Sequence, residues 1–235
     1  MVAMIPSPSS LTLVATLLCV VRGGSAAAVA EEASDDFTAP WFCHGIDCPP
    51  FSNTSVSGVE VRTYSQYLWA STNVSGVSLD DAENVGFDRL FDYISGANKA
   101  GATIDMTSPV LNRVVPGAGP NCNSTFIISF FTPFAYQKGG DKAAAGPPVP
   151  TADSDVYVGT IGPLTVAVSE FGGFATQAEL IARAARLTSE VEAADGLKPT
   201  AEMPGGDDSW FFAGYDPPFR LTGRHNEVWL PVEVL

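Results

Sequence analysis

Histidine and basic residues are scarce in this sequence, and the common catalytic motifs are missing from it. The chain has 235 residues but only two histidines, His44 and His225, and charged residues make up 16% of it. It contains no G-x-S-x-G nucleophile elbow, no G-x-x-x-x-G-K-[ST] phosphate loop and no H-E-x-x-H zinc motif. Because no residue set is marked for acid–base or nucleophilic chemistry, we expect a binding protein and not an enzyme.

Positive charge and long apolar runs are also limited, which excludes several classes of partner. The chain carries 12 Lys and Arg against 26 Asp and Glu, a formal net charge of −14. Nucleic acid and anionic lipid both attract basic surfaces, so we expect neither as a partner. The apolar run at residues 11–21 has eleven residues. A membrane-spanning helix needs about 20, so we expect no stable membrane insertion after this segment is cleaved.

The same apolar run indicates a signal peptide over residues 1–30. Residues 23–30 are mostly small, as a cleavage site requires. No Lys or Arg precedes the run, so a plastid transit peptide or an uncleaved anchor stays open. We expect a secreted, extracellular glycoprotein, with the vacuole as an alternative and the plastid as a less favoured one. Three N-glycosylation sequons agree with this route, and they begin at Asn53, Asn73 and Asn123.

Three cysteines follow the predicted signal peptide: Cys43, Cys48 and Cys122. An oxidising compartment permits one disulfide among them. A bond from Cys43 or Cys48 to Cys122 would tie the N-terminal arm to the domain that follows, whereas a Cys43–Cys48 bond would close a small loop. All three pairings stay open. His44 lies between two of these cysteines, but the short cluster has no second half that would complete a zinc site.

The chain beyond the signal peptide divides into an arm and one domain. Residues 31–57 are acidic and then Pro-rich, which indicates an irregular N-terminal arm, and residues 58–235 form the domain. One helix is expected from a Ser78 cap to residue 94, and a second over residues 176–191, where Thr176 and Glu179 form a capping box. A strand is expected at residues 59–64 and is continued by residues 67–70. Further strands are expected at residues 109–115, 126–134, 164–171, 210–213 and 227–230.

A Gly- and Pro-rich loop at residues 138–153 separates two halves of similar order. The pattern predicts a duplicated β-α-β-β unit in an α+β fold. In the second helix, one face is expected to point to the core; it carries Leu180, Ile181, Ala184, Leu187 and Val191.

The first helix and the residues after it carry the most informative pattern. Apolar residues fall at positions i, i+3, i+4 and i+7; they are Phe87, Leu90, Phe91 and Ile94. Gly96 follows where a left-handed helix cap belongs, and residues 104–108 are expected to be a short extended run. Such an aromatic stripe is either part of the core or the wall of an apolar pocket.

Three segments resemble the SOUL family of haem-binding proteins. The first is F-x-x-L-F-x-Y-I-x-G-x-N at residues 87–98, followed by I-x-M-T-x-P-V at residues 104–110. The second is EFGGFA at residues 170–175, and the third is FFAGYDPPFRLTGRHNEVWL at residues 211–230. The resemblance implies a distorted eight-stranded antiparallel β-barrel flanked by two helices. It also implies that haem or another tetrapyrrole is a reversibly bound ligand.

The resemblance implies a ligand pocket beside the first helix, with departures at the charged positions. Two methionines that the first helix of animal relatives is thought to present fall on Phe87 and Phe91, which keeps the wall apolar. The basic positions of those relatives fall on Asn84 and Asp92, where Asp92 would repel a propionate. Candidate replacements and further contacts are Arg89, Lys99, Leu90 and Met106.

The nature of any iron ligand stays unknown from the sequence. His225 is a candidate axial ligand, although it is most simply interpreted as an exposed loop histidine. Asp216, in the Gly-Tyr-Asp-Pro-Pro run, is expected to fix the backbone of a rigid turn.

We therefore expect a carrier, buffer or scavenger of haem or a related tetrapyrrole in the secretory or extracellular space. The alternative is an interaction protein that has kept the fold and lost the ligand, because the basic positions are not retained.

Overall fold

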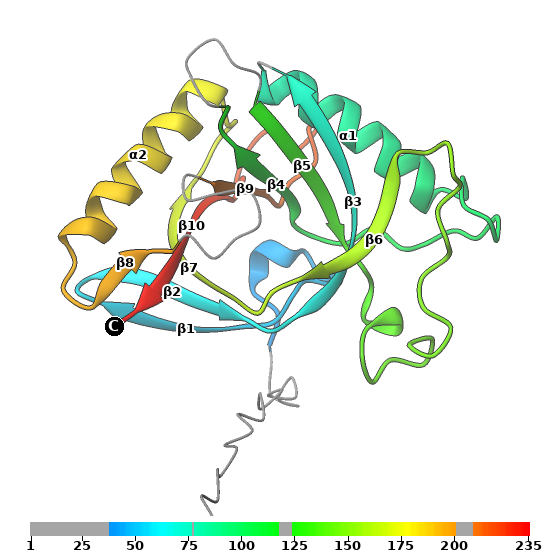
Figure 1. Ribbon diagram of the computed structural model, residues 1–235, viewed down its shortest axis with the longest axis horizontal. Helices are drawn as coiled ribbons and strands as arrows, with labels where there is room; N and C mark the ends of the chain where they lie inside the picture. Colours follow the sequence, from blue (N-terminus) through cyan, green and yellow to red (C-terminus); the bar gives the residue numbers. More distant parts are fainter. Residues whose placement is uncertain (1–37, 77, 118–123, 201–208) are drawn as a thin grey trace, which may run out of the picture. The chain divides into compact units, whose positions relative to one another are not determined.

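The computed structural model describes residues 38–76, 78–117, 124–200 and 209–235 (Figure 1). The predicted signal peptide, Cys122 and the sequon at Asn123 lie outside the described residues. The described part is an α+β fold, as predicted, with two α-helices outside a curved antiparallel sheet of ten strands.

The elements follow one another in two halves of matching order. The first half contains β1 (Phe51–Val56), β2 (Val59–Tyr64), β3 (Tyr67–Gly76), α1 (Leu79–Ile94), β4 (Val110–Val115) and β5 (Ser124–Phe131). The second half contains β6 (Val156–Ile161), β7 (Leu164–Phe171), α2 (Gln177–Ala193), β8 (Leu197–Pro199), β9 (Trp210–Gly214) and β10 (Asn226–Val234). Two short 3-10 turns, η1 (Trp41–Cys43) and η2 (Phe134–Tyr136), complete the described elements.

The sheet order is β1-β2-β7-β10-β9-β4-β5-β3-β6, with β8 paired to β10. The part of this order from β2 to β6 is symmetric. If β2, β3, β4 and β5 are taken as equivalent to β6, β7, β9 and β10, the order from β2 inward is equivalent to the order from β6 inward. The predicted duplication is therefore present, and its unit is β-β-α-β-β instead of β-α-β-β. The predicted eight strands correspond to these two units, and β1 and β8 are additions. Within the described residues no pairing joins β1 to β6, so the sheet is not a closed barrel.

The prediction of an irregular arm up to residue 57 is wrong for Phe51–Val56, which is strand β1. It pairs with β2 from Phe51↔Tyr64 to Val56↔Val59. The two residues between the strands, Ser57 and Gly58, both have positive φ, at 51° and 86°. A two-residue hairpin turn of this kind matches the twist of the strands on either side. The Ser-Gly pair is a turn signal in the sequence. It was not used because the Pro-rich composition of the preceding segment indicated irregular structure.

The helices begin where the sequence predicts, because both starts carry side-chain caps. The hydroxyls of Ser78 and Thr176 accept hydrogen bonds from the backbone N–H groups of Asp81 and Glu179, both at 3.3 Å. The predicted inner face of α2 is correct except at Ile181, whose side chain is 53% exposed. Residues 104–108, predicted as an extended run, form no strand, and β4 begins at Val110.

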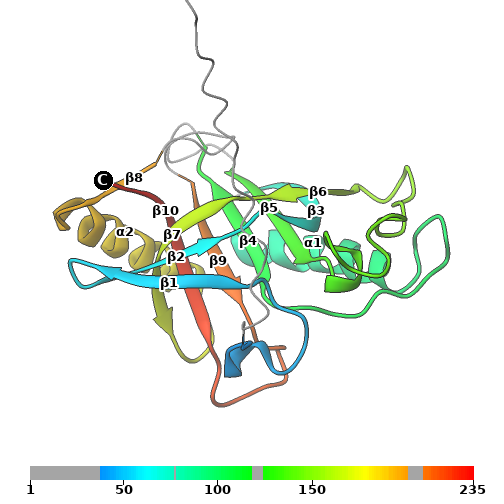
Figure 2. The same ribbon diagram turned by 90° about the horizontal axis from the view of Figure 1, so that it is seen from below.

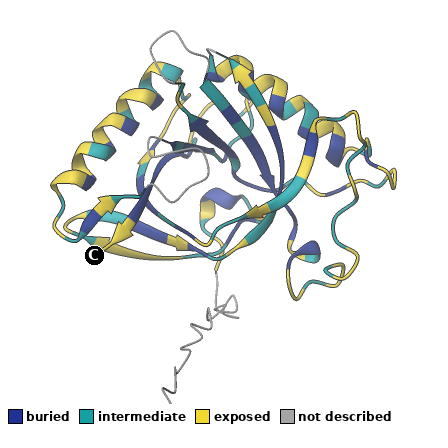
Figure 3. Ribbon diagram, in the orientation of Figure 1, coloured by how far each residue is buried: buried dark blue, intermediate teal, exposed yellow. Residues whose placement is uncertain are grey.

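The arrangement of the helices leaves the two central strands uncovered. The helix α1 packs mainly on β3, β5 and β6, and α2 packs mainly on β7, β8 and β10. Figure 2 shows the two helices toward opposite ends of the sheet with β4 and β9 between them. In Figure 3 the buried residues of both helices lie on the side that faces the sheet. The other side of the sheet curves around η1, where Phe42 and Cys43 pack with Tyr64, Trp69 and Trp229.

Candidate functional site

A cavity of about 1040 Å³ lies over the two strands that no helix covers. Val110 of β4 and Gly214 of β9 are directly paired in the sheet, and both line the cavity. The walls come from α1, the segment at residues 106–108, the loop before α2, the loop between β9 and β10, and the residues after η1. Pockets that bind small molecules usually measure about 300–1,000 Å³, so this one has room for a large ligand.

One face of α1 forms an aromatic wall of the cavity. Glu83, Phe87 and Phe91 are spaced at i, i+4 and i+8, and all three line the cavity. The rings of Phe87 and Phe91 stack with centroids 5.8 Å apart and an interplanar angle of 11°. Phe87 also contacts Phe130 of the sheet edge to face, whereas Phe91 is 48% exposed. The residues of the predicted stripe therefore have different positions. Phe87 and Phe91 line the cavity, whereas Leu90 is fully buried in the core and does not line it.

The opposite wall is apolar as well and comes from distant parts of the chain. Met106, predicted as a contact, lines the cavity together with Phe174 before α2 and Phe212 of β9. Phe219, in the loop between β9 and β10, lines it too and is 82% exposed. An exposed aromatic ring of this size at a cavity is typical of a ligand or interaction site.

The cations at the cavity are Arg220 and Arg224, which were not predicted from the sequence. Arg224 Nη1 donates to the carbonyl oxygens of Pro217 and Arg220, at 2.7 and 2.9 Å. Its guanidinium also lies 4.5 Å from the ring centroid of Phe174, a cation–π contact. Within the described residues no carboxylate forms an ion pair with Arg224. Arg220 Nε, in contrast, lies 3.1 Å from Asp216 Oδ1.

The cations predicted from the sequence lie elsewhere. Arg89 does not line the cavity and forms an ion pair with Asp155 at 3.0 Å. Lys99 is exposed in the loop after α1 and does not line the cavity. In the sequence, Arg220 and Arg224 follow the Pro217-Pro218 pair and are four residues apart. Their position at the cavity beside α1 depends on long-range packing, which the sequence pattern does not give.

A carboxyl group also faces this apolar cavity. Burial raises the pKa of Glu83, while a hydrogen bond from Asn112 and the charge of Arg224 act in the opposite direction. Asn112 Nδ2 donates to Glu83 Oε1 at 3.3 Å. The residues that line the cavity therefore combine an aromatic interior with two acids, Glu83 and Asp216, and two guanidinium groups.

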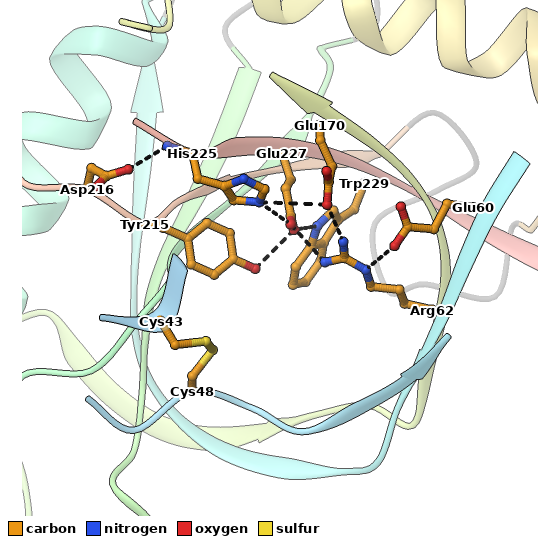
Figure 4. Close-up of polar contacts among 10 residues, drawn as sticks. All are labelled: Cys43, Cys48, Glu60, Arg62, Glu170, Tyr215, Asp216, His225, Glu227 and Trp229. Carbon is orange, nitrogen blue, oxygen red and sulfur yellow. Dashed lines mark hydrogen bonds and ion pairs between the residues drawn. A yellow bond between two sulfur atoms is a disulfide. The ribbon is translucent and has the colours of Figure 1, made fainter. Parts of the chain in front are cut away.

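A buried polar network supports the loop that carries these arginines (Figure 4). Its centre is Glu227 of β10, whose Oε1 lies 2.8 Å from Arg62 Nη1 and 2.6 Å from His225 Nε2. Its Oε2 accepts from the Tyr215 hydroxyl at 3.0 Å and from Trp229 Nε1 at 2.6 Å. Burial alone would raise the pKa of Glu227, but the His225 hydrogen bond and the Arg62 charge outweigh it and lower the pKa.

The interpretation of His225 as an exposed loop histidine is wrong. The residue is 6% exposed, and its ring stacks on Phe42 with centroids 4.1 Å apart. Its Nε2 is held by Glu227, and it does not line the cavity, so this geometry does not present it to a ligand there. Its backbone N–H donates to Asp216 Oδ2 at 2.6 Å, which confirms that Asp216 fixes the turn backbone.

The same network contains a grouping of metal-ligand types. Ligand atoms of Glu170, His225 and Glu227 lie within 4.8 Å of one another. Arg62 already donates to both carboxylates, at 2.7 Å to Glu170 and 2.8 Å to Glu227. Because the guanidinium supplies the positive charge there, the grouping functions as an ion-pair network in this structure.

The disulfide alternatives are resolved in favour of the small loop. Cys43 and Cys48 are bonded, with Cα atoms 5.9 Å apart, so their thiolates are not available to a metal. The loop between them places His44 and Ile46 at the cavity. Asp47 anchors it, since its Oδ2 accepts from the Phe134 N–H at 2.8 Å.

Two of the three predicted glycosylation sites lie within the described residues. Asn53 and Asn73 are both exposed, on β1 and β3. In the part of the chain that the structure describes, no helix is long and apolar enough to cross a membrane.

Comparison with known proteins identifies the family. The profile of the family described as "SOUL heme-binding protein" matches residues 46–231. "Heme-binding protein 2" of Homo sapiens is 33% identical over 190 residues, which cover 79% of this chain and 83% of that protein. "Heme-binding protein 1" of Xenopus laevis is 34% identical over 170 residues, which cover 72% of this chain and 81% of that protein.

A solved structure shares the fold at low sequence identity. The crystal structure of the EcmrR C-terminal domain has a TM-score of 0.52 at 11% identity, covering 79% of this chain and 99% of that one. This likeness concerns the fold alone. The family match spans most of the chain and agrees with the three motifs in their order. This chain belongs to the SOUL heme-binding protein family.

Proposed function

We propose that this protein binds haem or a related tetrapyrrole in the cavity beside α1 and acts as a carrier, buffer or scavenger. The observation that carries the proposal is the stacked pair Phe87 and Phe91 in the same cavity as Arg224, a cation with no carboxylate partner in the described chain. The family membership and the names of the relatives support a tetrapyrrole as the ligand.

The chemistry of the cavity suits a flat ligand with carboxylate groups. A porphyrin ring is apolar and planar, so it can lie against the aromatic wall of α1. Its propionates need cations, and guanidinium groups bind carboxylates through charge-assisted hydrogen bonds. Arg224 and Arg220 supply these donors at the cavity, in place of the basic positions that the first helix lacks.

The cavity offers little that would bind iron strongly. His44 lines it, but its Nε2 lies 2.9 Å from Asp216 Oδ1 and its Nδ1 lies 3.4 Å from Arg220 Nη1. The Tyr215 hydroxyl donates to Glu227. Met106 remains as a thioether of weak affinity. We therefore propose that stacking and ion pairing hold the ligand, that axial ligation is weak, and that the protein binds its ligand without catalysing a reaction.

The site of action that we propose is the secretory or extracellular space. The predicted signal peptide, the exposed sequon residues Asn53 and Asn73 and the buried Cys43–Cys48 bond support this proposal. Disulfides form and persist mainly in oxidising compartments. Expression in plant or animal cells followed by fractionation would test it, and retention of the unprocessed chain in the cytosol would contradict it.

A haemin titration with two matched variants tests the binding site. Phe91→Asp places a charge on the exposed part of the aromatic wall, and we expect it to raise the Kd of haemin at least about tenfold. Ile181→Asp is the control, because Ile181 is a similarly exposed apolar residue on α2 that does not line the cavity. Saturable, equimolar binding that survives Phe91→Asp would place the ligand elsewhere.

The interaction protein remains the second candidate function. The exposed side chains of Phe219, Leu221 and Trp41 favour it, since large exposed apolar residues mark interaction surfaces as well as ligand sites. If neither haemin nor protoporphyrin binds with saturation, this alternative is preferred.

A further inference from the structure

The cavity contains hydrogen-bond acceptors that haem does not need. The Glu83 carboxyl group faces it from α1, beside Phe87, and within the described residues it accepts one long hydrogen bond, the 3.3 Å contact from Asn112. Asn226 lines the cavity from the start of β10, and its Nδ2 donates to the Gly173 carbonyl at 2.8 Å. This bond fixes the amide, and its Oδ1 is buried away from solvent, so the acceptor that a ligand can reach is the Glu83 carboxyl group.

Acceptors in an apolar cavity favour a ligand that brings donors. A buried polar atom without a partner weakens binding, whereas a donor on the ligand removes that cost. In haem the four ring nitrogens are bound to iron, so the ring has no N–H group. An open-chain tetrapyrrole exposes pyrrole and lactam N–H groups along one edge. It also keeps two propionates, which Arg220 and Arg224 can bind as they would bind those of haem.

From this arrangement we propose that Glu83 is a specificity-determining residue, which makes the cavity prefer open-chain tetrapyrroles over iron porphyrin. The preference rests on the proposed tetrapyrrole site and deepens it. The charge pattern supports the assignment, because the cavity carries both signs. Arg224 lies close enough to influence the Glu83 carboxyl electrostatically. A ligand with carboxylates and N–H donors satisfies both groups, whereas haem satisfies only the arginines.

The partial burial of Glu83 gives the preference its strength. The pKa of Glu83 is raised chiefly because the carboxyl group is removed from water. Hydrogen bonds to an ionised acceptor are stronger than those between neutral groups, and a nearby N–H donor stabilises the ionised form. A ring that covers Glu83 without offering a donor would bury the carboxyl group further and weaken its own binding.

The test measures biliverdin and haemin binding to the full protein and two variants. Glu83→Gln keeps the shape of the side chain and an acceptor for Asn112 but removes the carboxylate. Asp88→Asn is the matched control, because Asp88 is an exposed acid on the same helix that does not line the cavity. Dissociation constants come from absorbance titrations at neutral pH, and thermal melting checks that each variant is folded.

We expect the wild-type protein to bind biliverdin more tightly than haemin. In Glu83→Gln the ratio of the two dissociation constants should shift toward haemin by about tenfold, and in Asp88→Asn it should stay within about twofold. Glu83→Leu, which removes the acceptor completely, should shift the ratio at least as far.

The outcomes separate the inference from the function on which it rests. If the wild-type protein binds neither ligand, the proposed tetrapyrrole function is wrong. If it binds both and the ratio is the same in wild type, Glu83→Gln and Glu83→Leu, the function stands and Glu83 is not a specificity residue. Tighter binding of haemin than biliverdin by the wild-type protein would also overturn the preference.

Discussion

Arg62 Nη1 lies 2.8 Å from Glu227 Oε1, and this buried ion pair joins β2 to β10 across the sheet. Both side chains are almost fully buried. Burial works to lower the pKa of Arg62, but the Glu227 charge outweighs it and the pKa is raised. The pair also positions Tyr215, whose hydroxyl donates a hydrogen bond to Glu227 and which lines the cavity. The stability of the fold and the form of the cavity therefore depend on the same contact.

Replacement of Arg62 should destabilise the protein strongly. Arg62→Met leaves Glu227 charged and buried without its cation, which typically costs about 3–5 kcal/mol. The control is Lys198→Met, which removes an exposed pair between Lys198 and Glu233 and should cost less than about 1 kcal/mol. Urea unfolding of both variants measures the two free energies. Equal losses would mean that the buried pair contributes no more than a surface contact.

Glu83 should produce a specific dependence of stability on pH. Its pKa is raised in the folded state, chiefly by burial, so the native protein binds this proton more tightly than the unfolded chain does. Above the folded pKa the ionised, partly buried carboxylate reduces stability. As pH falls through the folded pKa toward the unfolded value, the wild-type protein recovers that stability.

The comparison with Glu83→Gln isolates this effect, because other titrating groups contribute equally to both proteins. We expect the variant to be more stable than wild type at neutral pH, and the difference to shrink as pH falls toward about 4.3. Urea unfolding at a series of pH values gives the difference directly. A difference that stays constant over this range would contradict a raised pKa for Glu83 in the folded protein.

Removal of the Cys43–Cys48 bond should weaken both stability and binding. A disulfide that closes so short a loop contributes about 2 kcal/mol by restricting the unfolded chain. The Cys43→Ala, Cys48→Ala double variant should lose about this much, and its haemin affinity should fall as well, because the loop carries His44 and Ile46 to the cavity. Unfolding curves and haemin titrations measure the two effects. Lost stability with unchanged affinity would show that the loop is not a functional wall.

Local sequence signals predicted where the helices and strands of this fold lie in the chain better than they predicted how these elements pack together. Ser78 and Thr176 cap the two helices where the pattern indicated, because a cap depends on neighbours within one turn. The strand expected at residues 164–171 matches β7 (Leu164–Phe171). Ile181 was placed on the wrong face, since helical spacing alone does not give the width of the buried stripe.

The candidate site was predicted only in part. Phe87, Phe91 and Met106 lie at the cavity; helical periodicity pointed to the two phenylalanines, and the family motifs contain all three. The partner cations did not follow from the pattern, because Arg224 lies more than a hundred residues from α1 in the sequence. The fold brings the loop between β9 and β10 over the uncovered central strands. That proximity depends on the sheet order, which no local pattern encodes.

The two candidate cations, Arg89 from the sequence and Arg224 from the structure, give opposite expectations. Arg224→Gln should raise the Kd of haemin about tenfold, because it removes the cation that would pair with a propionate. Arg89→Gln should leave the Kd within about twofold, since Arg89 pairs with Asp155 outside the cavity.

Arg224 also donates to loop carbonyls, so loss of charge must be distinguished from a loosened loop. Haemin dimethyl ester, which lacks the propionate charges, makes this distinction. If the ion pair is the cause, the ester should bind wild type and Arg224→Gln with similar affinity. If the variant loses the ester as well, Arg224 acts through the shape of the loop. Weaker haemin binding in Arg89→Gln alone would favour the sequence-based assignment, in which the ligand carboxylates lie on the other side of α1.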